Sequence, residues 1–314
     1  MVEVAGHLKG RDFTRIGGWS SEELKTVLDL ADKLKALQAR REPHELLPGR
    51  TLGMIFQKPS TRTRVSFEVG MSQLGGDALY LAASDLQLGR GETVKDTANV
   101  LERYLDAIMI RTFAQDDVEQ LAEHTNIPVI NGLTDYAHPC QALADLMTIR
   151  ERLGRLSGVR LAYLGDGNNV CISLMVGAAR FGIRFVAATP VGYEPDETAV
   201  LAARRAAVQM GGTVELVRDP QEAARDADVV YTDTWVSMGE DADSERRRAD
   251  LAGYGIDADT LALAAQEAIV LHCLPAHYGE EITEEVLYGP QSAVWDQAEN
   301  RLHAQKALLA LVVR

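Results

Sequence analysis

The sequence is poor in cysteine. Its 314 residues include only three, Cys140, Cys171 and Cys273. Their number is odd, they are far apart, they form no C-x-x-C pair, and they stand at no metal-ligand spacing from a histidine. These absences exclude a disulfide scaffold and a structural zinc site, so we expect a reducing compartment and no bound metal.

Long hydrophobic runs are also missing. No stretch approaches the roughly 20 apolar residues that a membrane span needs. Residues 1–13 lack the apolar core of a signal peptide and the Arg- and Ser-rich character of an organelle address. We therefore predict a cytoplasmic protein with no membrane partner.

Positive charge is scarce, because 32 Lys and Arg face 46 Asp and Glu, which gives a formal net charge of −14. The basic triplet at 246–248 lies among acidic residues and is interpreted as a solvated surface. This balance excludes a typical nucleic-acid partner. It favours a small anionic substrate held in a local positive pocket.

What the sequence has instead is a regular alternation of short apolar runs and helical periods, typical of parallel sheets covered by helices. Strands are expected near 51–56, 79–81, 106–111 and 128–131, and then near 160–164, 184–188, 213–217, 228–232 and 269–272. We predict an α/β protein of two domains, each a parallel sheet flanked by helices. The first domain is residues 1–148, with the C-terminal helix 298–314 packing back on it, and the second is 149–297.

The most informative segment is Ser60-Thr61-Arg62-Thr63-Arg64, which stands between a strand and a helix. The first N–H groups of a helix have no intrahelical partner and the helix dipole favours negative charge, so these hydroxyls and guanidinium groups predict a phosphate site. An ordinary Ser/Thr cap with solvated arginines is the alternative. The spacing of Val65, Phe67, Val69, Met71 and Leu74 predicts that much of this helix is buried.

Other polar residues follow the expected strands, where ligands bind in open α/β sheets. They are Arg111, His138 to Gln141, Asp166 to Asn169, Asp233 to Gly239, and His272 to Pro275. For Asp233 and Ser237, binding of an ammonium group and plain solvation both remain open. The glycines near Asp166 lack the third glycine of a dinucleotide fingerprint, which disfavours NAD. His272 and Cys273 are sequence neighbours expected to point to opposite sides, which disfavours a Cys-His nucleophile.

In this order the motifs resemble the aspartate/ornithine transcarbamylase family over nearly the whole chain. Segments 60–64 and 138–141 are typical of the family in general. Ser237-Met238-Gly239 and His272-Cys273-Leu274-Pro275 are typical of its ornithine-specific members. Tyr278 departs from the pattern, because many relatives have Arg there.

The resemblance implies transfer of a carbamoyl group from carbamoyl phosphate to the δ-amine of ornithine, without a cofactor. It implies that carbamoyl phosphate is bound by Ser60, Thr61, Arg62, Thr63, Gln87, Arg111, His138, Gln141, Cys273, Leu274 and Arg301. Ornithine is assigned to Asn169, Asp233, Ser237 and Met238, and catalysis to Arg111, His138, Cys273 and Arg301. Gln87 matches a loop that family trimers lend to a neighbouring subunit, so a homo-oligomer of at least three chains is expected.

Three alternatives remain. One is a carbamoyltransferase for acetylornithine or putrescine. The second is a nucleotide-binding oxidoreductase built on the second α/β unit, and the third is a non-catalytic amino-acid-binding module. The direction of the reaction in the cell, synthesis or breakdown of citrulline, is not determined by these motifs.

Overall fold

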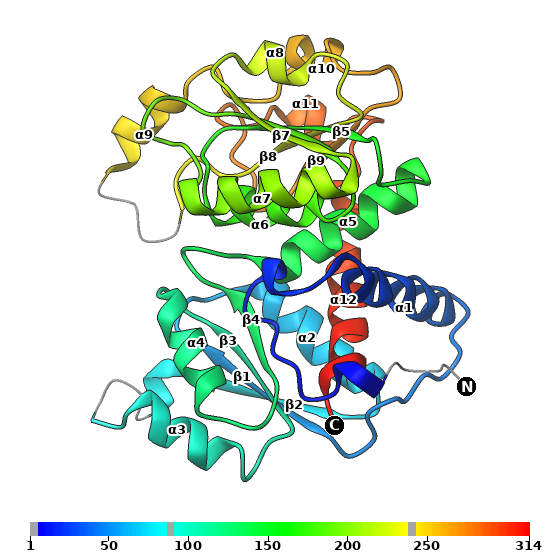
Figure 1. Cartoon of the computed structure of the whole chain (residues 1–314), viewed down its shortest axis with the longest axis vertical. Helices are drawn as coiled ribbons and strands as arrows, with labels where there is room; N and C mark the ends of the chain where they lie inside the picture. The colour runs from blue at the N-terminus through cyan, green and yellow to red at the C-terminus, as the bar shows by residue number, and fades with distance from the viewer. Residues whose placement is uncertain (1–5, 87–90, 238–242) are drawn as a thin grey trace. The chain divides into compact units, whose positions relative to one another are not determined.

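A computed structural model describes residues 6–86, 91–237 and 243–314, and the chain divides into two compact units (Figure 1). Unit 1 comprises Met1–Met147 and Glu299–Arg314, and unit 2 comprises Thr148–Ala298. The boundary falls within two long helices, α5 (Pro139–Leu153) and α12 (Val294–Val312). Gln87 and Met238 lie outside the described residues, so the structure does not bear on their predicted roles.

Unit 1 is an α/β layer built on four strands. Its 3-10 helices are η1 (Gly6–Leu8), η2 (Ile16–Gly18) and η3 (Ala83–Asp85). Its strands are β1 (Thr51–Phe56), β2 (Asp77–Ala82), β3 (Ala107–Arg111) and β4 (Val129–Leu133). The helices are α1 (Ser21–Ala39), α2 (Thr61–Gln73), α3 (Val94–Leu101) and α4 (Gln115–Glu123), with parts of α5 and α12.

Unit 2 has five strands: β5 (Arg160–Leu164), β6 (Arg184–Ala188), β7 (Thr213–Val217), β8 (Val229–Thr232) and β9 (Ile269–His272). Its helices are α6 (Asn169–Ala179), α7 (Glu197–Met210), α8 (Pro220–Ala224), α9 (Ser244–Leu251), α10 (Ala258–Ala262) and α11 (Glu284–Leu287).

Both sheets are parallel, with strand orders β2-β1-β3-β4 and β7-β6-β5-β8-β9. The fold class predicted from the sequence is confirmed, and each expected strand lies within about two residues of its predicted position. In a parallel sheet all carboxyl ends lie at one edge, so the loops that follow neighbouring strands are brought together.

The inner strands form because short runs of Val, Ile, Leu and Ala are buried on both faces under helices, whereas the edge strands β2 and β7 stay partly exposed. In unit 1 the core includes Ile55, Ile108 and Ile110. In unit 2 it includes Leu164 and Val230. Burial of such side chains contributes roughly 1.5 to 3 kcal/mol each.

Side chains also set where the helices begin. Ser20 and Glu23 form a reciprocal capping box at α1, and Asn168 accepts the backbone N–H groups of Val170 and Cys171 at α6. Each cap supplies a partner for N–H groups that the helix itself leaves unpaired. The caps therefore fix where α1 and α6 begin.

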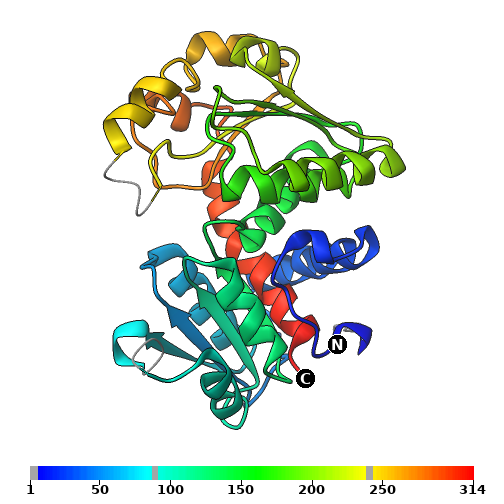
Figure 2. The same cartoon turned by 60° about the vertical axis from the view of Figure 1, so that its left-hand side comes forward.

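Helix α2 is less buried than its sequence pattern predicted. Phe67 and Met71 are buried, but Val65 is 51% and Val69 38% exposed. Helix α12 lies beside α2 (Figures 1 and 2), with hydrogen bonds from Gln305 to Ser66 and from Lys306 to Gln73. Within the described ranges, no helix is long and apolar enough to cross a membrane.

Candidate functional site

In unit 1 the predicted phosphate-binding segment begins beside Arg111. Strands β1 and β3 are in register, with Phe56 opposite Arg111, and Gln57 N–H donates to the Arg111 carbonyl at 2.8 Å. The chain then reaches Ser60, whose hydroxyl caps α2 by accepting the Thr63 N–H at 3.1 Å. The Ser/Thr helix cap that was the alternative to a phosphate site therefore exists, and it orients the start of α2.

Arg301, on α12, is the centre of a buried hydrogen-bond network in unit 1. It is 3% exposed. Its Nη1 donates to Gln141 Oε1 at 2.8 Å, and its Nη2 donates to Thr63 Oγ1 at 3.3 Å. Its Nε donates to Gln305 Oε1 at 2.9 Å. All three acceptors are neutral, so these bonds orient the guanidinium group without cancelling its charge.

Two residues that the sequence analysis missed hold this network in place. Gln141 Nε2 donates to Asp145 Oδ1 at 2.8 Å, so the Gln141 carbonyl is turned toward Arg301. Gln305 Nε2 donates to Ser66 Oγ at 2.7 Å. Asp145 stands four residues after Gln141 on α5, and Gln305 stands four residues after Arg301 on α12. Side chains at this spacing are neighbours on a helix, which is the signal that could have found both residues.

His138 immediately precedes α5 and is 5% exposed. Burial is the main reason that its pKa lies well below the usual 6.5, and three guanidinium groups lower it further, those of Arg301, Arg111 and Arg62. Each positive charge disfavours a second one nearby. The imidazole is therefore neutral at physiological pH, in a strongly cationic environment.

The nearby Cys140 is a buried structural thiol. Its Sγ donates to the Asn131 carbonyl at 3.4 Å, and burial raises its pKa to about 12. It stays protonated at neutral pH and is inert as a nucleophile. Cys140, Cys171 and Cys273 are all free thiols.

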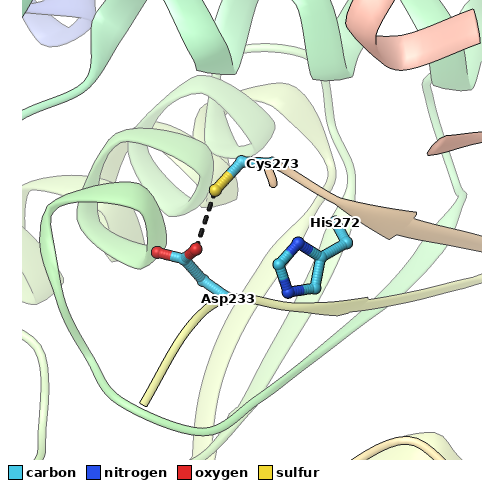
Figure 3. Close-up of side chains that lie close together, drawn as sticks. All are labelled: Asp233, His272 and Cys273. Carbon is cyan, nitrogen blue, oxygen red and sulfur yellow. Dashed lines mark hydrogen bonds between the residues drawn. The ribbon is translucent and has the colours of Figure 1, made fainter. Parts of the chain in front are cut away.

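In unit 2 three neighbouring strand ends meet around Asp233. Leu164, Thr232 and His272 are in register across β5, β8 and β9, so the residues that follow them lie at one edge of the sheet. Asp233 is 5% exposed. The Cys273 thiol donates to its Oδ1 at 2.7 Å (Figure 3), and Asn168 Nδ2 donates to its Oδ2 at 2.7 Å.

His272 and Cys273 do not point to opposite sides as predicted. Potential ligand atoms of both residues and of Asp233 lie within 4.8 Å of one another. The prediction failed because β9 ends at His272, and the chain then turns through Leu274, which has a φ of 60°. The thiol nevertheless donates to Asp233 and not to His272, so no Cys-His pair forms (Figure 3).

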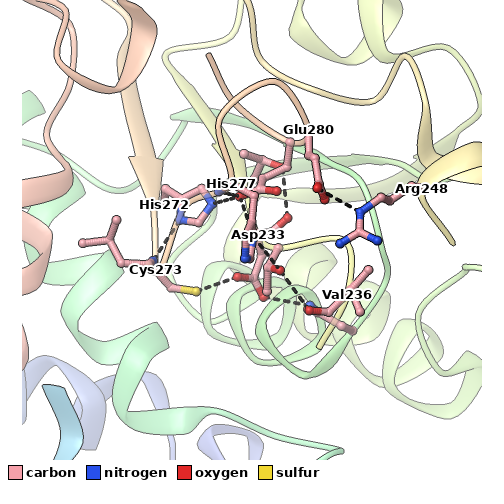
Figure 4. Close-up of polar contacts among 12 residues, drawn as sticks. Asp233, Val236, Arg248, His272, Cys273, His277 and Glu280 are labelled. Atoms are coloured by element: carbon pink, nitrogen blue, oxygen red, sulfur yellow. Dashed lines mark hydrogen bonds and ion pairs between the residues drawn. The ribbon is translucent and has the colours of Figure 1, made fainter. Parts of the chain in front are cut away.

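The imidazole of His272 supports the turn (Figure 4). Its Nδ1 accepts the Leu274 N–H at 2.8 Å, so Nε2 carries the proton and donates to Glu281 Oε1 at 3.2 Å. Glu281 also accepts the His277 N–H at 2.6 Å. These bonds hold the segment that carries Cys273 and Leu274 against the sheet.

Among the residues of unit 2 that the structure describes, two groups of side chains could hold a metal ion: Asp233 with His272 and Cys273, and His277 with Glu280 and Glu281. Each group already has partners within the protein. Glu280, for example, pairs with Arg248 at 2.8 Å (Figure 4). The expected absence of a metal stays a prediction.

Arg247 is not the solvated residue that its basic triplet predicted. Its side chain is 11% exposed and forms an ion pair with Asp166. Its Nε donates to the Trp235 carbonyl at 2.8 Å. Arg247 thus ties α9 to the loops after β5 and β8.

Gly167 allows the loop after β5 to approach the backbone at Pro195. A Cβ at position 167 would lie 2.3 Å from the Pro195 nitrogen, which is too close for any side chain.

Most of the predicted site residues fall into these two clusters. In unit 1, hydrogen bonds join Thr63, Gln141 and Arg301, and the guanidinium groups of Arg62 and Arg111 lie near enough to His138 to lower its pKa. Unit 2 joins Asp233 and Cys273. Thr61 is exposed at the first turn of α2, Asn169 is the first residue of α6, and Ser237 and Leu274 are partly buried.

Family models match both halves of the chain. Residues 11–151 match the carbamoyl-P binding domain of aspartate/ornithine carbamoyltransferase, and residues 157–312 match its Asp/Orn binding domain.

Individual relatives match along nearly the full length. The ornithine carbamoyltransferase of Symbiobacterium thermophilum is 57% identical over 98% of this chain and 99% of its own, and that of Pyrococcus horikoshii is 55% identical over 98% and 96%. The solved structure of ornithine carbamoyltransferase from Pyrococcus furiosus has a TM-score of 0.95, with 54% identity over 99% of both chains.

Proposed function

This chain belongs to the aspartate/ornithine carbamoyltransferase family, and we propose that it transfers the carbamoyl group of carbamoyl phosphate to the δ-amine of L-ornithine. The products are L-citrulline and phosphate. The observation that carries the choice of acceptor is the buried carboxylate of Asp233, bonded to the Cys273 thiol that follows β9. A buried carboxylate suits an ammonium-bearing substrate.

We propose that unit 1 is the carbamoyl phosphate-binding domain. Ser60, Thr61, Arg62 and Thr63 would hold the phosphate at the start of α2, where hydroxyls, backbone N–H groups and a guanidinium group all favour an anion. Arg301 would bind the same substrate. Its bonds to the neutral oxygens of Thr63, Gln141 and Gln305 orient the guanidinium group.

The same domain has the groups that carbonyl chemistry needs. As the amine attacks, negative charge grows on the carbonyl oxygen, and preorganised donors from Arg111 and His138 would stabilise it more than the ground state. His138 acts as a neutral donor, because its pKa is low. Gln141 Oε1 has a second lone pair with which to accept the carbamoyl N–H.

We propose that unit 2 is the ornithine-binding domain. Asp233 would pair with the α-ammonium, Asn169 would donate to the α-carboxylate, and Ser237 and Met238 would complete the site. Cys273 and the Leu274 carbonyl would orient the δ-amine. The neutral amine attacks directly, phosphate leaves, and the amine proton passes to solvent or phosphate, so no cofactor is required.

The test is citrulline formation from carbamoyl phosphate and each of four acceptors: ornithine, acetylornithine, putrescine and aspartate. Ornithine should be strongly preferred, because an analogue without the matching charge leaves buried polar groups of the site unpaired. A kcat/KM for putrescine or acetylornithine comparable to that for ornithine would favour the alternative acceptor. Fluorescence detection of NAD(P)H binding would favour the oxidoreductase instead.

We further propose that the active unit is a homo-oligomer of at least three chains. Unit 1 exposes large apolar side chains on α2 and on the neighbouring edge strand β2, which are 38 to 51% exposed: Val65, Val69, Leu79 and Tyr80. Exposed apolar side chains and the edge of a sheet are features that an interface can cover. By resemblance, the neighbouring chain would lend Gln87.

Mixing two inactive variants tests this sharing. Arg62→Ala and Gln87→Ala should each be nearly inactive, but co-refolded mixtures should regain part of the activity. In a cyclic trimer, an interface can combine an intact Arg62 from one chain with an intact Gln87 from the next. Native mass spectrometry would verify that mixed trimers have formed. If these trimers regain no activity, the proposal that Gln87 serves the neighbouring chain is contradicted, whereas the proposed reaction is not affected.

A further inference from the structure

Asp233 is held at both of its oxygens, and only one of the two partners belongs to the site predicted from the sequence. Cys273 donates to Oδ1 and Asn168 Nδ2 donates to Oδ2, each at 2.7 Å. A carboxylate with one partner can still rotate about its C–C bond, whereas two donors at opposite oxygens fix its plane. The remaining lone pairs then point in set directions.

The amide of Asn168 is itself locked in orientation. Its Oδ1 accepts the N–H groups of Val170 at 3.0 Å and Cys171 at 3.1 Å, and the hydroxyl of Tyr163 at 3.3 Å. A flipped amide would set its NH₂ group against three donors and its oxygen against the Asp233 carboxylate. The helix cap therefore determines which atom of Asn168 faces Asp233.

Tyr163 completes this support from the inside of the sheet. It is fully buried on β5 and stacks between the rings of Phe185 and Tyr231, with centroid distances of 6.5 and 5.7 Å. Burial, followed by the negative charge of Asp233, raises its pKa, so the hydroxyl remains a donor. A chain of contacts thus runs from the packed core through Asn168 to Asp233.

We propose that Asn168 is a positioning residue for ornithine: it couples the α6 cap to the Asp233 carboxylate and presets that carboxylate for the α-ammonium group. The inference rests on the proposed function. Preorganised groups bind more tightly because less rotational freedom is lost when the ligand arrives. Asn168 acts on ornithine through Asp233 and has no role toward carbamoyl phosphate.

Asn168→Ser separates the two roles of the residue. Serine is as good a helix cap as asparagine, but it has no amide to reach Asp233. We expect the KM for ornithine to rise about 10- to 30-fold, as for the loss of a hydrogen bond to a charged group. The KM for carbamoyl phosphate should stay unchanged, and the melting temperature should fall less than in Asn168→Ala, because the cap is kept although Tyr163 loses its acceptor. Asn168→Ala should show the same rise in KM with a lower melting temperature.

Asp257→Ala is the matched control for a lost cap. Asp257 accepts the Thr260 N–H at the start of α10 and belongs to neither of the two clusters described above. This variant should lower stability slightly and leave the KM for ornithine unchanged. A rise in KM equal to that of Asn168→Ser would mean that cap loss alone weakens binding, and it would overturn the proposal.

A double-mutant cycle then tests the route through Asp233. The probe is L-2-aminopentanoate, which keeps the α-ammonium and α-carboxylate but has no δ-amine to react, bound at saturating carbamoyl phosphate. Asn168→Ser should weaken its binding 10- to 30-fold in the native background and less than twofold in Asp233→Ala. Equal effects in both backgrounds, or none in either, would overturn the proposal.

The wild-type assay distinguishes the two claims. If the wild-type protein forms no citrulline, the proposed function fails. If it forms citrulline and Asn168→Ser keeps the native KM for ornithine, the positioning role alone is wrong.

Discussion

The two clusters differ in charge and in how they are assembled. The cluster of unit 1 is cationic and draws its members from α2, β3, α5 and α12, so Thr63 and Arg301 meet across 238 residues of sequence. The cluster of unit 2 centres on one carboxylate at three adjacent strand ends. Under the proposed function, many dispersed donors would match a multiply charged phosphate, whereas a single well-oriented acid would match one ammonium group.

The two clusters are alike in how their central charge is oriented. Arg301 donates to neutral oxygens of Thr63, Gln141 and Gln305. Asp233 accepts from neutral Cys273 and Asn168. Neutral partners therefore orient each charge, and neither contact cancels it.

The largest effect is expected from removing the central cation of unit 1. Arg301→Met should lower kcat/KM by on the order of 10³, because a buried donor to developing charge is lost together with its hold on Gln141 and Thr63. Steady-state kinetics would show this, with Arg152→Met as a control, since Arg152 is a surface residue paired with Asp296. A loss below about tenfold would place Arg301 outside the chemistry.

Removing the central anion of unit 2 should have a smaller and differently distributed effect. Asp233→Asn keeps the size of the side chain but loses the charge, so the KM for ornithine should rise about a hundredfold or more, as for a charged hydrogen bond. The KM for carbamoyl phosphate should stay near the native value. Equal increases in both KM values would break the assignment of one substrate to each unit.

His138→Ala should lower kcat by about a hundredfold, as expected for one lost donor to an oxyanion. The KM for ornithine should change little. His138→Gln, which keeps a neutral N–H donor, should recover part of the loss, because the imidazole acts without a positive charge. Near-native kcat in the alanine variant would show that His138 takes no part in catalysis and only precedes α5.

The smallest effect concerns stability in acid. Burial, followed by the charge of Lys306, lowers the pKa of His303 on α12 to about 4. Because the unfolded chain takes up this proton near pH 6.5, the stability that neutral His303 contributes is complete above pH 6.5. As the pH falls from 6.5 toward 4 this contribution is lost, and the free energy of unfolding decreases by at most about 3 kcal/mol.

His303→Gln should therefore reduce the acid sensitivity of unit 1 between pH 6.5 and 4. Hydrogen exchange measured by mass spectrometry at pH 7 and pH 5 would locate the change in peptides of α12 and its neighbours. Unit 2 peptides serve as the internal control. The same acid response in the variant and the native protein would show that His303 is not the group responsible.

The order of strands and helices could be predicted because it depends on local patterns. In the inner strands, short runs of β-branched and apolar residues are buried on both sheet faces, and Ser60 and Asn168 are polar caps at the starts of helices. Residues that follow strands could be predicted as site candidates because parallel strands end at one edge. Arg111 and Asp233 are of this kind.

Contacts between distant residues could not be predicted in this way. Arg247 looked solvated because its neighbours in sequence are charged, yet it pairs with Asp166 from another loop. Cys273 was expected to face away from His272 because strand alternation was extended one residue too far. Val65 and Val69 match a buried helix pattern but are exposed.

The sequence by itself therefore determined the α/β architecture and the chemical types gathered at the strand ends, because both follow from periodicity and chain order. Only the tertiary structure decided which partner holds each charge: Gln305 and Gln141 for Arg301, and Asn168 for Asp233. The physical reason is that a hydrogen bond depends on the direction of a donor and an acceptor in space. Packing of α12 on α2, and of three strands side by side, sets that direction.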